Sequence, residues 1–172
     1  VTPTGGVPSA IAAVHSPAMD DWDRLLGSTL RIAREWLASL DDRPVAPTAT
    51  HDELLAAFPQ ELPEHGEDPT AVVEAMARAA TPGLVASTGP RFYGFVFGGT
   101  VPPALGADWL TGVWDQNASM YVSSPATSII EELAGRWVLE LAGLPTDAGV
   151  GFTTGATMAN FAGLAAAREK VL

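Results

Sequence analysis

The chain has 172 residues, of which 47% are hydrophobic, and it contains no cysteine. This length allows one hydrophobic core, and without cysteine there can be neither a disulfide nor a thiolate zinc site, so no metal site is expected. The formal net charge of −11 would repel a phosphate backbone, so we expect no nucleic-acid partner. We also expect a cytoplasmic protein without a membrane partner, because no basic leader and no apolar run of roughly 18 residues is present.

The first half of the chain predicts helices and no strand. Residues 1–17 are rich in Pro, Gly and Ser, which indicates a flexible N-terminal arm. Apolar residues between positions 20 and 40 recur at spacings of three and four, a pattern typical of an amphipathic helix. Two shorter helices are expected at residues 52–58 and at 68–80 or 69–80, the second opened by Pro69 and stopped by Pro82-Gly83.

Between residues 92 and 100 the chain concentrates aromatic side chains among glycines. Such a segment predicts a loop, because glycine punctuates regular structure. The aromatic rings could pack into the core, which is the commoner fate of aromatic residues, or they could line a ligand. The composition of the loop leaves both interpretations open.

Two more helices are expected in the second half. The first begins at Pro102-Pro103, is broadly apolar and ends near the polar run Asp115-Gln116-Asn117. This run is either a functional trio or a C-terminal cap with Asn117 in the left-handed conformation. The second helix begins after Ser124, with Ser128 and Glu131 at a capping-box spacing, and ends at Gly143-Leu144-Pro145.

Residues 149–161 predict a short strand that runs through a small-residue turn into an Ala-rich helix. Small side chains let the backbone come close to a ligand. The N–H groups of the first helical turn then point at that ligand, assisted by the positive end of the helix dipole. The turn therefore predicts a phosphate-sized anion site. In the alternative interpretation, Thr154 to Thr157 only cap the helix.

Over roughly residues 89–170 the chain resembles the N-terminal part of the group II pyridoxal-phosphate-dependent decarboxylases, which include aromatic amino-acid and glutamate decarboxylases. Five pieces carry the resemblance in order and in spacing. They are Pro90-Arg91-Phe92-Tyr93-Gly94-Phe95, Pro103-Ala104-Leu105-Gly106-Ala107-Asp108-Trp109-Leu110, Asp115-Gln116-Asn117, Ser124-Pro125-Ala126-Thr127 with Glu131-Glu132, and Phe152-Thr153-Thr154-Gly155-Ala156-Thr157-Met158-Ala159-Asn160. A single piece is weak, but five in register indicate the family.

The resemblance implies an α/β enzyme of fold type I, of which this chain would form a mostly helical part. That part would be the N-terminal helical segment plus the first strand and helix of the large domain. Residues 1–17 would be the flexible arm and residues 18–86 a dimerisation segment that wraps around the other subunit of a homodimer. Residues 87–172 would be the incomplete start of the large domain that binds pyridoxal phosphate.

The same resemblance implies site residues. Gly155, Ala156 and Thr157 would hold the phosphate of pyridoxal 5'-phosphate through backbone N–H groups and the Thr157 hydroxyl. Phe95, Phe97 and Thr127 would approach the substrate pocket, partly across the dimer interface, and plain core or cap roles for them are equally open.

The implied reaction is the loss of the α-carboxylate of a small-molecule amino-acid substrate as carbon dioxide, with the cofactor as electron sink. The Schiff-base lysine would lie outside this chain, since Lys170 has the place of an ordinary exposed helix cation. We therefore expect the chain alone to be inactive, as a fragment or with the remainder of the enzyme as a second chain. Alternatives are another fold type I lyase or aminotransferase, and a non-catalytic fragment that acts only in association. One departure from the family pattern is Gly89-Pro90, where relatives commonly carry His-Pro.

Overall fold

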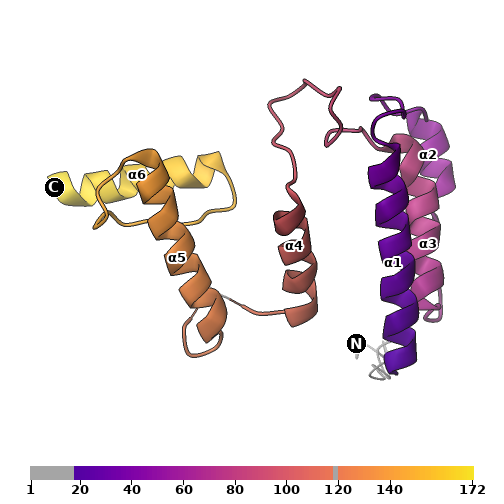
Figure 1. Cartoon of the computed structure of the whole chain (residues 1–172), viewed down its shortest axis with the longest axis horizontal. Helices are drawn as coiled ribbons and strands as arrows, with labels where there is room; N and C mark the ends of the chain where they lie inside the picture. Colours follow the sequence, from indigo (N-terminus) through magenta and orange to yellow (C-terminus); the bar gives the residue numbers. More distant parts are fainter. Residues whose placement is uncertain (1–17, 118–119) are drawn as a thin grey trace, which may run out of the picture. The chain divides into compact units, whose positions relative to one another are not determined.

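The computed structural model describes residues 18–117 and 120–172, so the predicted N-terminal arm lies outside the described residues. Within the described ranges every regular element is a helix (Figure 1). The helices are α1 (Met19–Ser39), α2 (His51–Ala57), α3 (Pro69–Ala80), α4 (Pro102–Trp114), α5 (Pro125–Ala142) and α6 (Ala156–Val171), with a 3₁₀ turn at Thr81–Gly83. Each predicted helix is confirmed to within a few residues.

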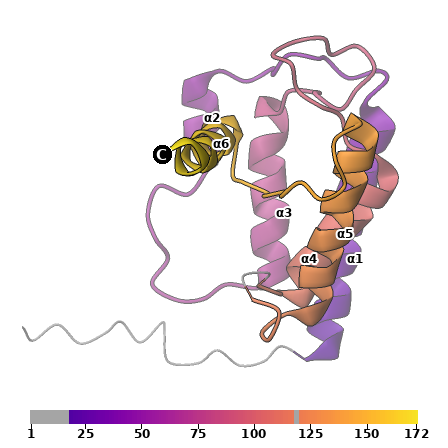
Figure 2. The same cartoon turned by 90° about the vertical axis from the view of Figure 1, so that its left-hand side faces the viewer.

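The chain divides into two compact units, and the boundary in the sequence lies between Val101 and Pro102. The first unit holds α1 to α3 and the aromatic loop, and the second holds α4 to α6. In the first unit, the connection from α2 runs back along α3 to the start of that helix (Figure 2). The division into a dimerisation segment at 18–86 and a large-domain segment at 87–172 stays a prediction. Across the part of the chain that the structure describes, no helix has both the length and the apolar content of a membrane span.

α1 and α3 lie side by side (Figure 1), and polar contacts join residues 24–31 of α1 to residues 68–74 at the start of α3. Arg24 on α1 donates to Asp68 at 2.6 Å. Glu74 on α3 accepts from the Ser28 hydroxyl at 2.5 Å and from Arg31 at 3.0 Å. The Ser28 hydroxyl, followed by the Arg31 guanidinium, lowers the pKa of the Glu74 carboxyl. Since exposed ion pairs add little stability, these contacts mainly fix how α3 is aligned on α1.

Side-chain caps open α2 and α3. The Thr50 hydroxyl accepts from the Glu53 N–H at 3.3 Å and the Glu53 carboxylate accepts from the Thr50 N–H at 2.8 Å. Sequence analysis missed this capping box, although Thr-His-Asp-Glu carries its spacing. Hydrogen bonds from the Thr50 backbone N–H and from the Thr50 hydroxyl lower the pKa of the Glu53 carboxyl. Asp68 accepts from the Ala71 N–H at 2.9 Å just before Pro69, and this bond lowers the pKa of Asp68.

α5 ends as its sequence predicts. Gly143 has a left-handed backbone (φ 64°), and its N–H donates to the Glu140 carbonyl at 3.1 Å. The Leu144 N–H donates to the Leu139 carbonyl at 2.9 Å. These two bonds form a Schellman motif, which needs a residue that tolerates positive φ at the position of Gly143.

The strand predicted before α6 is wrong for the described residues. Residues 149–154 have no regular secondary structure. A strand requires a neighbouring strand for its backbone hydrogen bonds, and no other extended segment in the described ranges pairs with this one. The segment is held by packing instead: an added Cβ on the buried Gly135 of α5 would lie only 3.3 Å from the Cβ of Val150.

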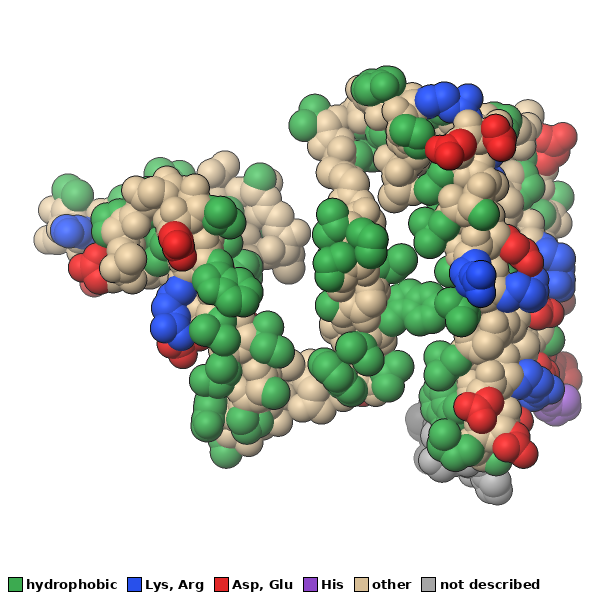
Figure 3. Space-filling view, in the orientation of Figure 1, with side chains coloured by type: hydrophobic (Ala, Val, Ile, Leu, Met, Phe, Trp, Pro, Cys, Tyr) green, Lys and Arg blue, Asp and Glu red, His purple; other side chains and the backbone are tan. Residues whose placement is uncertain are grey.

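Few side chains are fully buried within either unit. Among the described residues the buried apolar ones are Ala86, 1% exposed, and Leu139, 4% exposed. Large hydrophobic side chains are spread over the surface instead (Figure 3). The hydrophobic core that the composition allows is therefore not formed by the described residues alone.

Candidate functional site

The turn before α6 has a fixed backbone. Gly155 precedes the helix in a fully extended conformation (φ 164°, ψ 174°). Its carbonyl oxygen accepts the Ala159 N–H at 3.1 Å and the Thr153 hydroxyl at 3.2 Å. Because a peptide plane holds its C=O and N–H in opposite directions, these two bonds also fix the direction of the Ala156 N–H. The bond from Thr153 to the Gly155 carbonyl was not predicted from the sequence. The one sign of it there is a hydroxyl residue two positions before Gly155.

The donor set at the start of α6 suits a phosphate. The N–H groups of Ala156, Thr157 and Met158 have no acceptor within the helix, and the Thr157 hydroxyl lies in the same turn. No acidic residue is present in the first turn of α6, and the helix dipole adds positive potential there. The interpretation in which threonines only cap the helix is wrong, because Gly155 is at the N-cap and no side chain there makes a capping bond.

The aromatic loop carries its rings on the surface. The ring centroid of Phe97 lies 5.9 Å from that of Phe92 and 5.8 Å from that of Phe95. Phe95 is 84% exposed and Phe97 is 63% exposed, so the core-packing interpretation is wrong within this chain. Phe95 and Val96 have left-handed backbones (φ 58° and 57°), which cost non-glycine residues about 1–2 kcal/mol each. Strain of this kind is concentrated at ligand sites.

Thr127 lies in the first turn of α5 and makes a local hydrogen bond. Its hydroxyl donates to the Ser124 carbonyl at 3.1 Å, and the Ser128 hydroxyl donates to the same oxygen at 3.0 Å. The predicted capping box of Ser128 with Glu131 is therefore wrong, because Ser128 already lies inside the helix and bonds back to a carbonyl. Thr127 belongs to the second unit, as Gly155 to Thr157 do, whereas Phe95 and Phe97 belong to the first.

The polar run after α4 closes that helix. The left-handed position is taken by Asp115 (φ 46°), where the sequence analysis expects Asn117, and the Gln116 side chain donates to the Trp114 carbonyl at 2.8 Å. The cap interpretation therefore has support, with Asp115 as its left-handed residue. No group of three or more His, Cys, Asp or Glu residues that could hold a metal ion occurs in the described ranges.

The departure at Gly89 has a spatial cause. A Cβ at this position would lie 3.2 Å from the Ala86 carbonyl oxygen and 3.4 Å from the Leu40 carbonyl oxygen. Both neighbours are backbone atoms and cannot rotate away. A histidine at position 89 would require these backbone atoms to shift by a few tenths of an ångström.

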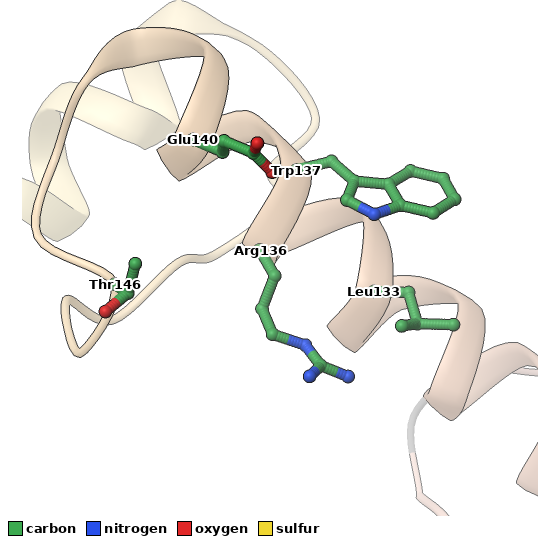
Figure 4. A pocket seen from close by; sticks show the side chains of 5 residues that line it. All are labelled: Leu133, Arg136, Trp137, Glu140 and Thr146. Atoms are coloured by element: carbon green, nitrogen blue, oxygen red, sulfur yellow. The ribbon is translucent and has the colours of Figure 1, made fainter.

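A shallow depression beside α5 was not predicted. It has a volume of about 330 Å³ and is bounded by Leu133, Arg136, Trp137, Glu140 and Thr146 (Figure 4). The Trp137 side chain extends away from α5 and is 62% exposed. The Arg136 guanidinium lies 3.6 Å from the Glu132 carboxylate in a surface ion pair. No hydrogen bond joins Thr146 to Glu140 among the described residues, and we assign the depression no catalytic role.

Comparisons with known proteins agree with the resemblance. A family model described as the pyridoxal-dependent decarboxylase conserved domain matches residues 52–172. The chain is 28% identical over 111 residues to an aromatic-L-amino-acid decarboxylase of Manduca sexta, and 26% identical over 133 residues to one of Bacillus atrophaeus. It is 24% identical over 127 residues to a 3,4-dihydroxyphenylacetaldehyde synthase of Aedes aegypti. These matches take in 64%, 77% and 74% of this chain but only 22%, 28% and 24% of those proteins, respectively.

A solved structure supports the fold. The chain superposes on a 4-hydroxyphenylacetaldehyde synthase of Rhodiola rosea with a TM-score of 0.66 at 20% identity, over 76% of this chain and 28% of that one. The likeness shows that the chain shares the fold of part of a fold type I decarboxylase, and that this part is helical in the described residues. The chain spans about a quarter of the length of its curated relatives. Since the family model covers well over half of its residues, the chain belongs to the pyridoxal-phosphate-dependent decarboxylase family.

Proposed function

We propose that the chain is the N-terminal portion of an amino-acid decarboxylase and that it supplies the turn that binds the cofactor phosphate. The observation that carries this proposal is the turn at Gly155, where the carbonyl is held by two donors and the first helical turn has no acid. The turn lies inside the region that the family model matches. Bound pyridoxal phosphate supplies the electron sink that stabilises the charge left on the α-carbon when carbon dioxide departs.

Each residue of the turn has a separate task in this proposal. The Ala156 and Thr157 N–H groups and the Thr157 hydroxyl donate to phosphate oxygens, as charge-assisted hydrogen bonds. Gly155 leaves room for the ligand: a Cβ there would meet no atom of this chain within 4 Å, so crowding inside the chain does not explain the glycine. Thr153 holds the Gly155 carbonyl and thereby keeps the donors in place before the phosphate arrives.

The aromatic loop and the start of α5 form part of the substrate pocket in this proposal. Support comes from the exposed rings of Phe95 and Phe97, which offer an apolar surface for an amino-acid side chain, and from the left-handed backbone of Phe95. Thr127 keeps acceptor capacity on its oxygen, because its hydroxyl proton is used by the Ser124 carbonyl. α1 to α3 contribute to a homodimer interface, and α1 keeps Trp22 42% and Leu30 48% exposed for this contact.

The phosphate site can be tested on the 172-residue chain. We expect pyridoxine 5'-phosphate, which has no aldehyde and forms no imine with Lys170, to shift the amide NMR resonances of Ala156, Thr157 and Met158. Pyridoxine without phosphate should shift none of them. Thr157→Val should weaken binding about tenfold through loss of a hydrogen bond to a charged group, and Thr157→Ser should retain it. Equal shifts with pyridoxine, or none with the phosphate ester, would contradict the proposal.

A second candidate function is favoured by the names of two similar proteins, both of which are acetaldehyde synthases. In that case the complete enzyme would convert an aromatic amino acid, dioxygen and water to an aldehyde, carbon dioxide, ammonia and hydrogen peroxide. Product analysis of the complete enzyme separates the candidates: both release carbon dioxide, but the decarboxylase leaves an amine, whereas the synthase leaves an aldehyde and consumes dioxygen. A keto acid without carbon dioxide would indicate an aminotransferase. We expect no turnover by the 172-residue chain alone in any of these cases.

A further inference from the structure

A set of contacts joins the C-terminal end of α1 to the chain just before the aromatic loop. The Ala86 N–H donates to the Val45 carbonyl at 3.0 Å. Further along, the Arg91 guanidinium donates to the Arg43 carbonyl at 2.6 Å, across 48 positions of sequence. Arg91 is therefore the last residue tied to the α1 end before the loop begins at Phe92.

The residue that accepts from Arg91 is itself firmly held. The Arg43 guanidinium lies 3.6 Å from the centroid of the Trp36 ring, and its Nη1 donates to the Ser39 hydroxyl at 3.0 Å. The Arg43 N–H donates to the Ser39 carbonyl at 2.9 Å. A guanidinium that is stacked and hydrogen-bonded in this way has few remaining conformations. The Arg43 carbonyl is therefore a fixed acceptor at the end of α1.

The backbone between these contacts is tightly packed. Ala86 is 1% exposed, and the Gly89 N–H donates to its carbonyl at 3.0 Å. Any side chain at position 89 would come within 3.4 Å of the Leu40 carbonyl oxygen. The backbone at Ala86 and Gly89 therefore lies close to the end of α1.

Arg91 differs from several of the arginines on the helices. Arg24, Arg31 and Arg136 each lie within 4 Å of a carboxylate, whereas Arg91 has its short contact with a backbone carbonyl. A charged donor on a neutral carbonyl makes a stronger bond than a neutral donor would. The bond from Arg91 to this carbonyl does not pair the guanidinium with an acidic side chain, so its effect is to fix the path of the chain.

We propose that Arg91 is a positioning residue that, together with the Arg43–Trp36 stack, sets where the aromatic loop leaves α1 and hence where Phe95 and Phe97 lie in the substrate pocket. We call this set, Arg91, Arg43 and Trp36, the Arg91 latch. The consequence for the pocket rests on the proposed function, while the latch itself is a property of this chain. The two parts are therefore tested by different measurements.

The latch is tested by amide hydrogen exchange of the 172-residue chain. We expect Arg91→Ala to speed exchange of the hydrogen-bonded Gly89 and Phe92 amides about fivefold, the effect of losing one hydrogen bond, while amides inside α1 stay unchanged. Arg91→Lys keeps a donor and should restore much of the protection. The matched control is Arg78→Ala, which removes the same charge from a distant surface ion pair with Glu74.

Unchanged exchange at Gly89 and Phe92 in Arg91→Ala would overturn the latch, as would an equal change in Arg78→Ala. Trp36→Leu provides a second measurement, because it removes the stacking surface and should speed the same two amides. These outcomes do not depend on whether the chain binds a cofactor phosphate.

The effect on the pocket is tested in the complete enzyme. Arg91→Ala should raise KM for the amino-acid substrate about fivefold, with kcat retained. A displaced loop loses contacts that bind the substrate equally well in the ground state and in the transition state. A fall in kcat at unchanged KM would overturn the assignment of Arg91 to substrate positioning. Failure of pyridoxine 5'-phosphate to bind would contradict the proposed function but would leave the exchange result intact.

Discussion

Substitution of Gly135 tests what positions the turn at residues 153–157, which we call the phosphate turn. This glycine is buried in α5, and residue 150 of the segment that leads into the turn packs on it. An added Cβ would lie 3.3 Å from the Cβ and 3.5 Å from the Cγ1 of Val150. Ordinary carbon contacts lie at about 3.5–4.0 Å. The segment therefore rests on α5 because position 135 has no side chain.

The size of the side chain added at position 135 decides whether the segment with Val150 docks less tightly on α5. Gly135→Ala needs a displacement of a few tenths of an ångström, and its helix propensity gains about 1 kcal/mol over glycine, so we expect little net change. Gly135→Leu gains about as much propensity but places three more carbons where Val150 lies, and overpacking costs about 1–3 kcal/mol. We expect the leucine variant to weaken docking of the segment by about 1 kcal/mol, which is about fivefold in the docking equilibrium.

The assay is the set of NMR contacts between the Val150 methyl groups and α5 side chains. In Gly135→Ala these contacts should persist, with a new one to the added methyl group. In Gly135→Leu they should weaken while the helical circular dichroism is kept. The matched control is Gly163→Leu in α6, because a Cβ at Gly163 meets no atom within 4 Å.

Two results would refute this reasoning. One is a leucine variant that keeps the Val150 contacts at full strength, which would mean that the segment is not packed on position 135. The other is an equal loss of contacts in the Gly163 control, which would mean that the effect comes from adding leucine to any helix of this unit. In the complete enzyme, the same Gly135→Leu change should reduce cofactor affinity, because a displaced segment carries the turn with it.

Three smaller changes test the helices. Thr50→Ala should lower the stability of α2 by about 1 kcal/mol through loss of its cap, seen in chemical denaturation, and Thr50→Ser should not. Gly143→Ala should cost about 1 kcal/mol, because φ is 64° there, and a lower midpoint with an unchanged m-value would show it. The pKa values of Asp68 and Glu74 are lowered in the folded state. Their stabilisation is therefore present above their ordinary pKa values and is lost on acidification below about pH 4. A melting temperature that does not fall from pH 5 to pH 3 would contradict this.

The features that could be predicted from the sequence are those with a short-range cause. Pro69 opens α3 and Gly143 closes α5 because proline and glycine act on the backbone at their own positions. The capping box at Thr50 has an equally local cause, because Thr50 and Glu53 have the required spacing. The turn at Gly155 and the start of α6 were predictable for the same reason, and the use of this turn as an anion site stays a prediction.

The features that could not be predicted depend on residues far away in the chain. A strand is defined by its partner, so the residues at 149–154 could not by themselves decide whether a strand forms. Phe95 and Phe97 were open to either interpretation, because burial depends on what else packs there. The bond from Arg91 to the Arg43 carbonyl spans 48 positions, and no spacing rule connects residues at that separation.

The difference between short-range and long-range causes also separates the proposed cofactor recognition from the proposed substrate choice. A phosphate can be held by backbone N–H groups, so residues 153–157 alone support the proposed cofactor class. The shape of a substrate pocket depends on where side chains such as Phe95 are held, and in this unit their path begins at a contact between α1 and the chain before the loop. A change of substrate preference is therefore expected from substitutions at the Arg91 latch.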